Sequence, residues 1–581
     1  GLPLHCVPVD TRLLNQPLLN RRAALKLFAS GAGMAVLAAC GGAAAPASSS
    51  APAASPAAAS AKASLAATST SAPGRAASTA TTPAAAKPSA ATVSAAAKPV
   101  AGTPKSGGTL RLGIIGDIST LDGHNTTPSQ FDTTWSVFDR LIGYDQKLQP
   151  QPQLAESWEL TPDLKQITLH LRKGVTWHSG REFTSDDVKY NMLRVRDAKL
   201  QIPTLRNQSM WFTTIDTPDK YSVVLASDAP RPAMFDFFEY FNQVDKGTME
   251  GPDAKTKSIG TGPFKFVEWV QGDHLTFAKN PNYWQTGRPY LDQFVALVRS
   301  DQAMLAQFEA GALDVAKGPA PRDFARYKAD PKYQTLISTI SGNYFLFGLN
   351  LGIPPLDNKL VRQALNYAID RRRFADTFLL GAGTAEALPW PPGSAAFEAA
   401  KQNAYGFDLN KAGALLKQAG ATSFGLDCNV LNTWPMLVDF APAYQADLAK
   451  IGVKLNIRNL ELATWVDEAV NRKYKGMYLS NSAFGQLEPS STLSAGRATD
   501  PNSNNEQFNN QQYKDLIASA SSEPDPNKRK AIYSQLNDIL LDESFIMPLA
   551  SYPPVLAMKP NVQGIEPSAH DGFYYHNAWL A

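Results

Sequence analysis

Two adjacent carboxylates, Asp186 and Asp187, are the residues of this sequence that most resemble an acid–base pair. A pair of carboxyl groups can act as general acid and general base in hydrolysis. These two follow Thr184 and Ser185, however, and a threonine ahead of two acids is typical of the first turn of a helix. There the hydroxyl caps free N–H groups, and the carboxylates favour the positive end of the helix dipole. We therefore predict a helix start at Thr184 and no catalytic role for the two acids.

The short motifs that mark catalytic, metal or nucleotide sites are missing from the sequence. Its seven histidines form no His-x-x-x-His pair, and its three cysteines form no Cys-x-x-Cys pair. There is no Gly-x-Ser-x-Gly elbow and no phosphate-binding loop, and Cys428 is a lone cysteine of the kind that usually packs in a core. We predict no catalytic residue, no metal site and no cofactor. Catalytic residues drawn from distant segments would leave no such motif, so a surface hydrolase acting on saccharides stays an alternative.

Cys40 is a candidate for covalent lipidation on sulfur. It ends the run Leu37-Ala38-Ala39-Cys40, which resembles a lipobox, and a weakly apolar stretch and the basic residues Arg21, Arg22 and Lys26 precede it. A charged front, a short apolar middle and small residues before the cut describe an export signal, over residues 1–40, and this run is too short to span a membrane comfortably. The alternative is a buried amphipathic helix with an incidental cysteine. We predict export by the twin-arginine or the Sec route, and a lipid on Cys40 that holds the protein at the outer face of the cytoplasmic membrane.

Composition divides the rest of the chain into a tether and a globular part. Residues 41–106 are almost entirely Ala, Ser, Thr and Pro, which offer too little apolar surface to offset the entropy of ordering, so we predict a disordered tether. Residues 107–581 are rich in aromatic residues and interspersed charge, and their length suits one unit of two or three lobes. The net charge of +3 gives no reason to expect a nucleic-acid partner, and we expect a monomer.

The elements expected in the globular part mix strands and helices, which predicts an α/β architecture. Period-two patterns predict strands at residues 109–114, 167–171, 221–225, 264–269 and 454–457. Apolar stripes of helical spacing predict helices at residues 358–369, 410–420 (capped by Asn410), 440–451 and 527–542. A further apolar run, residues 546–549, follows the last helix.

Several motifs in the globular part resemble the family of dipeptide-, oligopeptide- and nickel-binding proteins, the extracytoplasmic solute-binding subunits of ABC importers. They are LAESWE at residues 154–159, LRKGVTWHSGREFTSDDV at residues 171–188, GTGPF at residues 260–264, NPNYW at residues 280–284, and VRQA and YAID between residues 361 and 370. They follow one another in the family's order across most of residues 107–581. Each of them also reads as turn or cap chemistry, so we expect most of these residues to be scaffold.

The resemblance implies a two-lobed periplasmic-binding-protein-like fold, of class II and of the large peptide-binding type, with a cleft between the lobes. The first lobe would comprise residues 107–342 completed by residues 545–581, and the second lobe residues 343–544. Asn343 and Tyr344, at the first crossing between the lobes, would line the cleft. Closure of such a cleft takes place at a few hinge residues in the crossing segments.

The resemblance also bears on the solute. Peptide-binding members hold the peptide's amino terminus with an aspartate, and Gly485 stands where that aspartate is expected. A buried ammonium without a counter-charge is strongly penalised, so we do not expect an ordinary free peptide. Aromatic residues on the expected cleft segments, Tyr344, Trp390, Trp434 and Phe484, suit an aromatic or sugar-like solute, and Arg497 could hold a carboxylate. For each of these residues taken singly, core packing or plain surface exposure is the alternative.

The sequence therefore predicts an extracytoplasmic, lipid-anchored protein that captures a small solute and delivers it to the permease and ATPase of an ABC importer, without chemistry. A sensory or chaperone-like binding role on the same fold is a further alternative.

Overall fold

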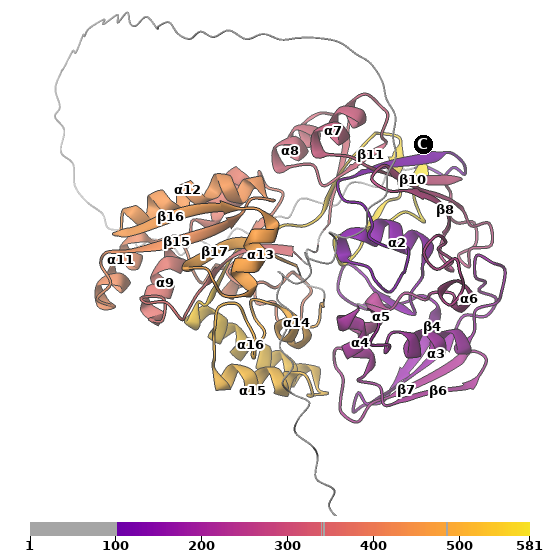
Figure 1. Cartoon of the computed structure of the whole chain (residues 1–581), viewed down its shortest axis with the longest axis horizontal. Helices are drawn as coiled ribbons and strands as arrows, with labels where there is room; N and C mark the ends of the chain where they lie inside the picture. The colour runs from indigo at the N-terminus through magenta and orange to yellow at the C-terminus, as the bar shows by residue number, and fades with distance from the viewer. Residues whose placement is uncertain (1–101, 201, 339, 341–342, 484–485) are drawn as a thin grey trace, which may run out of the picture. The chain divides into compact units, whose positions relative to one another are not determined.

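A computed structural model describes residues 102–581 except residues 201, 339, 341–342 and 484–485. One large sheet, drawn at the right of Figure 1, has the strand order β12-β19-β11-β1-β10-β9-β8. Its strands are β1 (Thr109–Ile114), β8 (Phe264–Val270), β9 (His274–Lys279), β10 (Gln293–Val298), β11 (Val315–Lys317), β12 (Gln334–Ile337) and β19 (Val555–Met558). The helices α7 (Asp301–Glu309) and α8 (Pro321–Ala329) contact its strands. We call the part of the chain built on this sheet lobe I.

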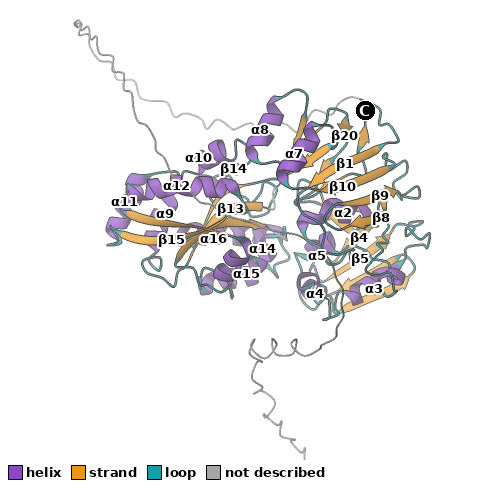
Figure 2. Cartoon of the chain, turned by 45° about the horizontal axis from the view of Figure 1, so that its top comes forward, coloured by secondary structure: helices purple, strands orange, loops and turns teal. Residues whose placement is uncertain are grey.

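A second large sheet has the strand order β14-β18-β13-β17-β15-β16, and we call the part built on it lobe II. Its strands are β13 (Asn343–Leu349), β14 (Thr384–Ala385), β15 (Phe424–Leu431), β16 (Val453–Leu460), β17 (Gly476–Ala483) and β18 (Ile546–Ser551). Alternate residues of β13 enter two different apolar clusters, because successive side chains of a strand point to opposite faces. One cluster includes residues of α9 (Lys359–Tyr367), α11 (Leu409–Gln418) and α12 (Pro435–Ala449), and the other includes residues of α14 (Pro489–Ala495), α15 (Gln511–Ala520) and α16 (Pro526–Glu543). Figure 2 shows helices on both sides of this sheet.

The chain crosses between the two sheets twice. It leaves β12 of lobe I to enter β13 of lobe II, and it leaves β18 of lobe II to enter β19 of lobe I. Since β18 pairs with β13 and β14, the return to lobe I begins after Ser551 and not at residue 545 as the sequence suggested. The local sequence could not reveal this difference, because residues 546–549 read equally well as a strand of either sheet.

Lobe I carries a smaller four-stranded antiparallel sheet with the order β4-β5-β7-β6. Its strands are β4 (Ala155–Leu160), β5 (Gln166–Leu171), β6 (Thr214–Asp219) and β7 (Ser222–Ala226). Four helices contribute to its apolar cluster: α2 (Phe131–Val137), α3 (Ser185–Arg194), α4 (Pro203–Ser209) and α5 (Met234–Tyr240). The Asp236 side chain on α5 contacts lobe II, and residues of α4 line a cavity together with residues of lobe II.

Most of the expected elements are confirmed. The strands predicted at residues 109–114, 167–171, 221–225, 264–269 and 454–457 correspond to β1, β5, β7, β8 and β16. The helix predicted to start at Thr184 is α3, and Thr184 and Asp187 form a reciprocal capping box there. The helix expected from Asn410 is α11, but its cap is Asp408, whose carboxylate accepts from the Lys411 N–H at 2.9 Å.

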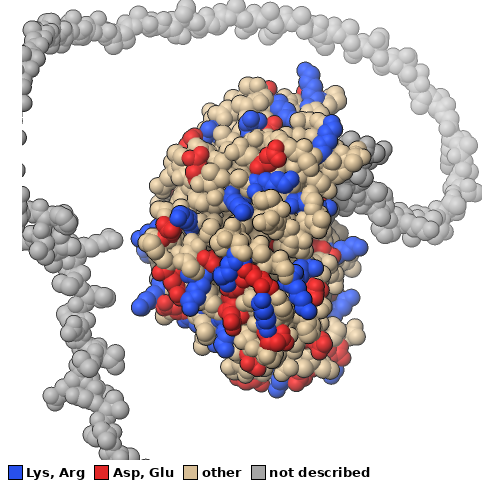
Figure 3. Space-filling model, turned by 90° about the vertical axis from the view of Figure 1, so that its right-hand side faces the viewer, with Lys and Arg blue, Asp and Glu red and all other residues tan. Residues whose placement is uncertain are grey.

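The described surface and helices bear on the expected partners. Figure 3 shows Lys and Arg side chains interspersed with Asp and Glu on the face of lobe I that it presents, which is not the one-signed surface that nucleic acid favours. From residue 102 onwards, none of the helices that the structure describes is long and apolar enough to cross a membrane.

Candidate functional site

Asn343 and Trp434, two of the residues expected to line the cleft, meet through Asn481 at the end of the lobe II sheet where the chain crosses. The Trp434 indole N–H donates to the Asn481 side-chain oxygen at 3.0 Å, and the Asn481 amide donates to the Asn343 side-chain oxygen at 3.2 Å. Each of the three sits at an element end, since Asn343 opens β13, Trp434 is the N-cap residue of α12 and Asn481 lies near the end of β17. No motif or pattern in the sequence indicates Asn481 as a site residue.

The Trp434 ring joins an aromatic group at the same crossing. Its centroid lies 5.5 Å from that of Phe345 and 5.9 Å from that of Tyr552, both in edge-to-face arrangement. Tyr552 directly follows β18, so Trp434 packs against a residue of the second crossing and against Phe345 of β13. The indole N–H of Trp434 is already engaged, so this half-buried ring can offer a solute only its apolar surface.

Tyr344 and Trp390 lie inside lobe II. Both are 2% exposed and belong to the apolar cluster that includes Leu388 and Phe545. The Trp390 indole N–H donates to Asn537 at 2.6 Å, and burial raises the pKa of Tyr344 well above its usual range. As placed, both rings are core side chains, and their contact with a solute stays a prediction.

The other expected site residues contribute less to the described site. Phe484 and Gly485 lie outside the residues that the structure describes, and so does Cys40. Arg497 is exposed beyond the end of α14, where its carbonyl accepts from the Asn505 N–H at 2.9 Å. Its role towards a carboxylate stays a prediction.

The carboxylate of Asp236 on α5 connects lobe I to lobe II. It accepts from the backbone N–H of Leu487 at 3.2 Å and of Glu488 at 3.1 Å, and from the Tyr144 hydroxyl at 3.1 Å. Burial, followed by the negative charge of Glu488, raises the pKa of Asp236 to about 7. Asp236 is 1% exposed, so this contact between the lobes is shielded from water.

Both sides of this contact are held in place by further hydrogen bonds. Glu488 caps α14 by accepting from the N–H of Ser490 at 2.9 Å, and it accepts from the Tyr533 hydroxyl on α16. In lobe I, Glu239 lies one turn after Asp236, pairs with Arg140 at 2.8 Å and accepts from the Tyr144 N–H at 2.9 Å. The segments that carry the two sides of the contact are therefore anchored within their own lobes.

A cavity of about 460 Å³ is lined by residues of both lobes. Lobe I contributes α4 and neighbouring residues, among them Gln208, Trp211 and Arg231, and lobe II contributes Gln486 and the serines of α14. Its size lies within the range of small-molecule sites. None of the described residues that the sequence suggested for the cleft lines this cavity. Its polar side chains come from scattered positions in the sequence, so no motif indicates them.

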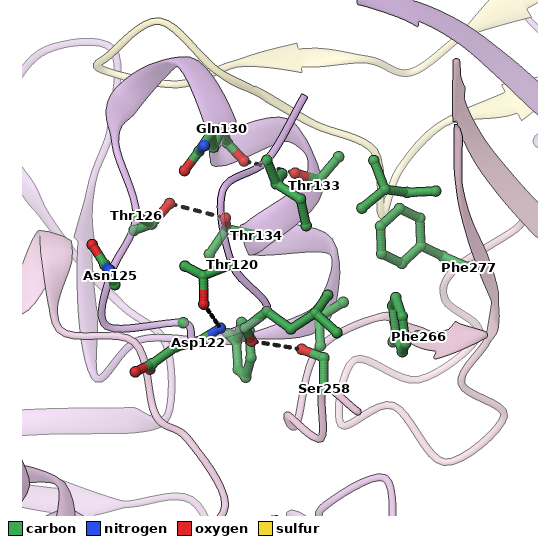
Figure 4. Close-up of a pocket in the computed structure, with 16 residues that line it drawn as sticks. Thr120, Asp122, Asn125, Thr126, Gln130, Thr133, Thr134, Ser258, Phe266 and Phe277 are labelled. Atoms are coloured by element: carbon green, nitrogen blue, oxygen red, sulfur yellow. Dashed lines mark hydrogen bonds between the residues drawn. The ribbon is translucent and has the colours of Figure 1, made fainter. Parts of the chain in front are cut away.

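A second cavity lies entirely within lobe I and is too small for a solute. Thr120, Thr126, Thr134 and Ser258 are among the lining residues drawn in Figure 4, with a hydrogen bond of 3.0 Å between the two hydroxyls of Thr126 and Thr134. Its volume of about 20 Å³ is close to what one water molecule needs.

The residues considered for chemistry have structural roles. Asp187 accepts from Arg181 at 2.7 Å and from the Thr184 N–H at 2.9 Å, as expected of a capping residue. Cys428 is fully buried on β15, and burial raises the pKa of its thiol. Within the described ranges, no group of three or more His, Cys, Asp or Glu residues is arranged to hold a metal ion.

Comparisons with known proteins connect the chain to one family. Residues 149–504 match the model of the bacterial extracellular solute-binding proteins, family 5. The heme-binding protein A of Haemophilus influenzae is 30% identical over 75% of this chain and 86% of its own length. The di/tripeptide-binding protein 1 of Pseudomonas aeruginosa is 28% identical over 77% of this chain and 90% of its own.

Solved structures give the same result for the fold. The binding protein AgaA of A. tumefaciens R10, solved with agropinic acid, superposes with a TM-score of 0.67 at 27% identity, over 82% of this chain and 99% of that one. The substrate-binding protein CtaP of Listeria monocytogenes reaches 0.74 at 22% identity, over 82% of this chain and all of that one. The expected two-lobed α/β fold is thereby confirmed.

Proposed function

Because the chain belongs to the bacterial extracellular solute-binding proteins of family 5, we propose that it holds one small solute in the cavity between its lobes and hands it to the permease of an ABC importer. The observation that carries the proposal is the cavity of about 460 Å³ whose lining comes from both lobes. A solute there contacts both sets of residues only when the lobes are together. The chain itself performs no chemistry in this account.

In this account the solute works by shifting the balance between open and closed lobes. A ligand that contacts both lobes stabilises the closed form by its differential affinity for that form. The Asp236 contact with Leu487 and Glu488 also stabilises the closed form, because it joins the two lobes. The two crossings, before Asn343 and after Ser551, are the places where the backbone can hinge. The closed form is the one that the permease would receive.

We further propose that the solute is not an ordinary free peptide but an aromatic or sugar-like compound. Gly485 occupies the position at which peptide-binding relatives are expected to carry an aspartate. In addition, none of the described residues that line the cavity is an aspartate or a glutamate. A ligand ammonium buried there would lack a counter-charge, which costs several kcal/mol or more.

Calorimetry of the purified chain against di- to pentapeptides of mixed sequence tests the exclusion of peptides. We expect no submicromolar binding by any of them, because the described lining of the cavity offers no carboxylate to an amino terminus. Submicromolar binding of any peptide would contradict the exclusion.

We also propose that the protein is exported and held at the outer face of the membrane by a lipid on Cys40. Residues 41–106, of which the structure describes only the last five, would then join the lipid to the globular part of the chain. A single acyl chain binds membranes only marginally, so stable anchoring implies more than one chain.

Fractionation of cells tests the lipid anchor. The full chain is expected in the membrane fraction, and the Cys40→Ser variant is expected in the soluble extracytoplasmic fraction, because serine cannot form the thioether to the lipid. The Cys428→Ser variant is the matched control and should fractionate as the unmodified chain does. Membrane retention of Cys40→Ser would rule the anchor out.

A further inference from the structure

The cavity between the lobes contains two buried polar atoms without partners among the described residues. One is the Nε of Arg231 and the other is the Oε1 of Gln208, and both side chains line the cavity. Gln208 is 5% exposed, so its oxygen is out of reach of bulk water. A buried donor or acceptor without a partner costs about 1–3 kcal/mol, and a bound ligand that supplies the partner recovers this cost.

Arg231 is the charged residue of the lining. Its Nη2 lies 3.4 Å from a carboxylate oxygen of Asp228, but the Asp228 side chain is 74% exposed, and exposed pairs of this kind contribute ~1 kcal/mol or less. Its guanidinium lies 5.7 Å from the centroid of the Trp211 ring. Arg231 therefore keeps both its charge and a buried N–H for a ligand, beside an aromatic surface.

The remaining polar lining is neutral and rich in hydroxyl and amide groups. Thr204 and Asn207 belong to α4, and Ser490, Ser491 and Ser494 belong to α14. Such groups can donate to and accept from hydroxyls, whereas a ligand carboxylate prefers the planar fork of an arginine. The lining thus combines one cation, one aromatic ring and many neutral hydrogen-bonding groups.

From this we infer that the solute is a small hydroxyl-rich carboxylic acid of the sugar-acid class, with its carboxylate at Arg231 and a hydroxyl donating to the Gln208 oxygen. The inference rests on the proposed function and specifies the ligand of the same cavity. The absence of acidic residues from the described lining is consistent with an anionic ligand. The Trp211 ring supplies the apolar surface on which the carbon skeleton of such a ligand lies.

Calorimetry with defined probes tests this inference on the full chain freed of any carried-over ligand. The probes are gluconate, glucuronate, galacturonate, glucose, glucose 6-phosphate and a dipeptide mixture. We expect at least one sugar carboxylate to bind at least about ten-fold more tightly than glucose and glucose 6-phosphate, since a hydrogen bond to a charged group contributes ~1.5–3 kcal/mol and 1.4 kcal/mol is a factor of ten. Failure of every sugar carboxylate to exceed glucose overturns the inference.

Substitutions locate the effect within the cavity. Arg231→Gln is expected to weaken sugar-acid binding by about ten-fold or more and to weaken glucose binding less, and Gln208→Leu is expected to weaken both. Arg322→Gln is the matched control, because Arg322 is exposed on α8 and lies outside the cavity lining. Arg231→Lys, which keeps the charge without the fork, replaces Arg231→Gln if thermal unfolding shows that the latter does not fold.

The outcomes separate this inference from the proposed function. Equal sugar-acid affinities of the Arg231 and Arg322 variants overturn the inference. If another class of solute, such as the dipeptides or glucose 6-phosphate, binds one to one, capture stands and the sugar-acid assignment falls. If no probe binds and the protein as purified carries no small molecule, both fall.

Discussion

Replacing Asp236 by alanine is expected to weaken solute binding by about ten- to a hundred-fold without changing any residue that lines the cavity. The carboxylate accepts two backbone N–H groups of the opposite lobe, at 3.2 Å from Leu487 and 3.1 Å from Glu488. Hydrogen bonds to charged groups contribute about 1.5–3 kcal/mol, and 1.4 kcal/mol is a factor of ten in affinity. A variant without the contact populates the closed form less, and its apparent affinity falls by the same fraction.

Asp236→Asn serves as the matched control for this prediction. The asparagine oxygen can still accept from the N–H groups of Leu487 and Glu488. The Asp236→Asn variant should therefore lose less affinity for the solute than the Asp236→Ala variant. Calorimetry with the carried-over solute measures both. Equal affinities of the alanine variant and the unmodified chain would show that the contact does not contribute to closure.

The same carboxyl group predicts a pH dependence of stability. The pKa of Asp236 in the folded chain, about 7, lies above the ordinary value of 3.8, so folding favours the protonated form. Its contribution to the free energy of unfolding is therefore fully present below about pH 4 and is lost as the pH rises through about 7. The groups that influence it are Tyr144 and Glu488, and the pKa of nearby Glu239 is also raised to about 7. Chemical denaturation measures the free energy of unfolding at pH 5 and at pH 8. The difference between these two values should be smaller for Asp236→Asn than for the unmodified chain.

Replacing Arg140 by alanine is expected to lower the free energy of unfolding by about 3–5 kcal/mol, the usual cost of removing one partner of a buried ion pair. Arg140 and Glu239 lie 2.8 Å apart, and both side chains are 1% exposed. Arg140 also donates to the Tyr574 hydroxyl at 2.6 Å, and its guanidinium lies 3.8 Å from the centroid of Trp135. Alanine leaves Glu239 buried without its charge partner and removes this packing.

Arg326→Ala is the matched control for Arg140→Ala. Arg326 also pairs with a glutamate, Glu309 at 2.7 Å, and also lies over an aromatic ring, that of Tyr327 at 4.4 Å. Its side chain is 51% exposed, so its loss should cost about 1 kcal/mol or less. Chemical denaturation measures both variants, and similar losses would contradict the account of the buried pair.

Local patterns in the sequence predicted the fold well where neighbouring residues determine the structure. The strand β1 follows from its alternation and the start of α3 from its capping box, because both depend on residues close together in the chain. The same reasoning failed at α11, where Asp408 and Asn410 are equally good caps and only tertiary packing decides. It also misplaced the boundary at residue 545, because strand pairing over long distances leaves no local trace.

The site was harder to predict, because its parts are far apart in the sequence. Gln208 and Arg231 come from lobe I, Gln486 comes from lobe II, and no motif links them. The sequence around Asp236 does indicate an unusual environment for its carboxyl group. Asp236 stands in the run MFDFFEYF at residues 234–241, where an acid among aromatic residues must either be exposed or have buried partners. The resemblance to a family predicted a cleft between two lobes, but the residues that line the cavity required the structure.

Native mass spectrometry of the chain as purified, followed by denaturation and identification of what is released, is the most direct test of solute capture without chemistry. We expect one small molecule per chain, released intact on denaturation, rebound by the refolded or dialysed protein and unchanged after incubation. A chain that carries and rebinds nothing, or that converts the released molecule into a product, would contradict the account.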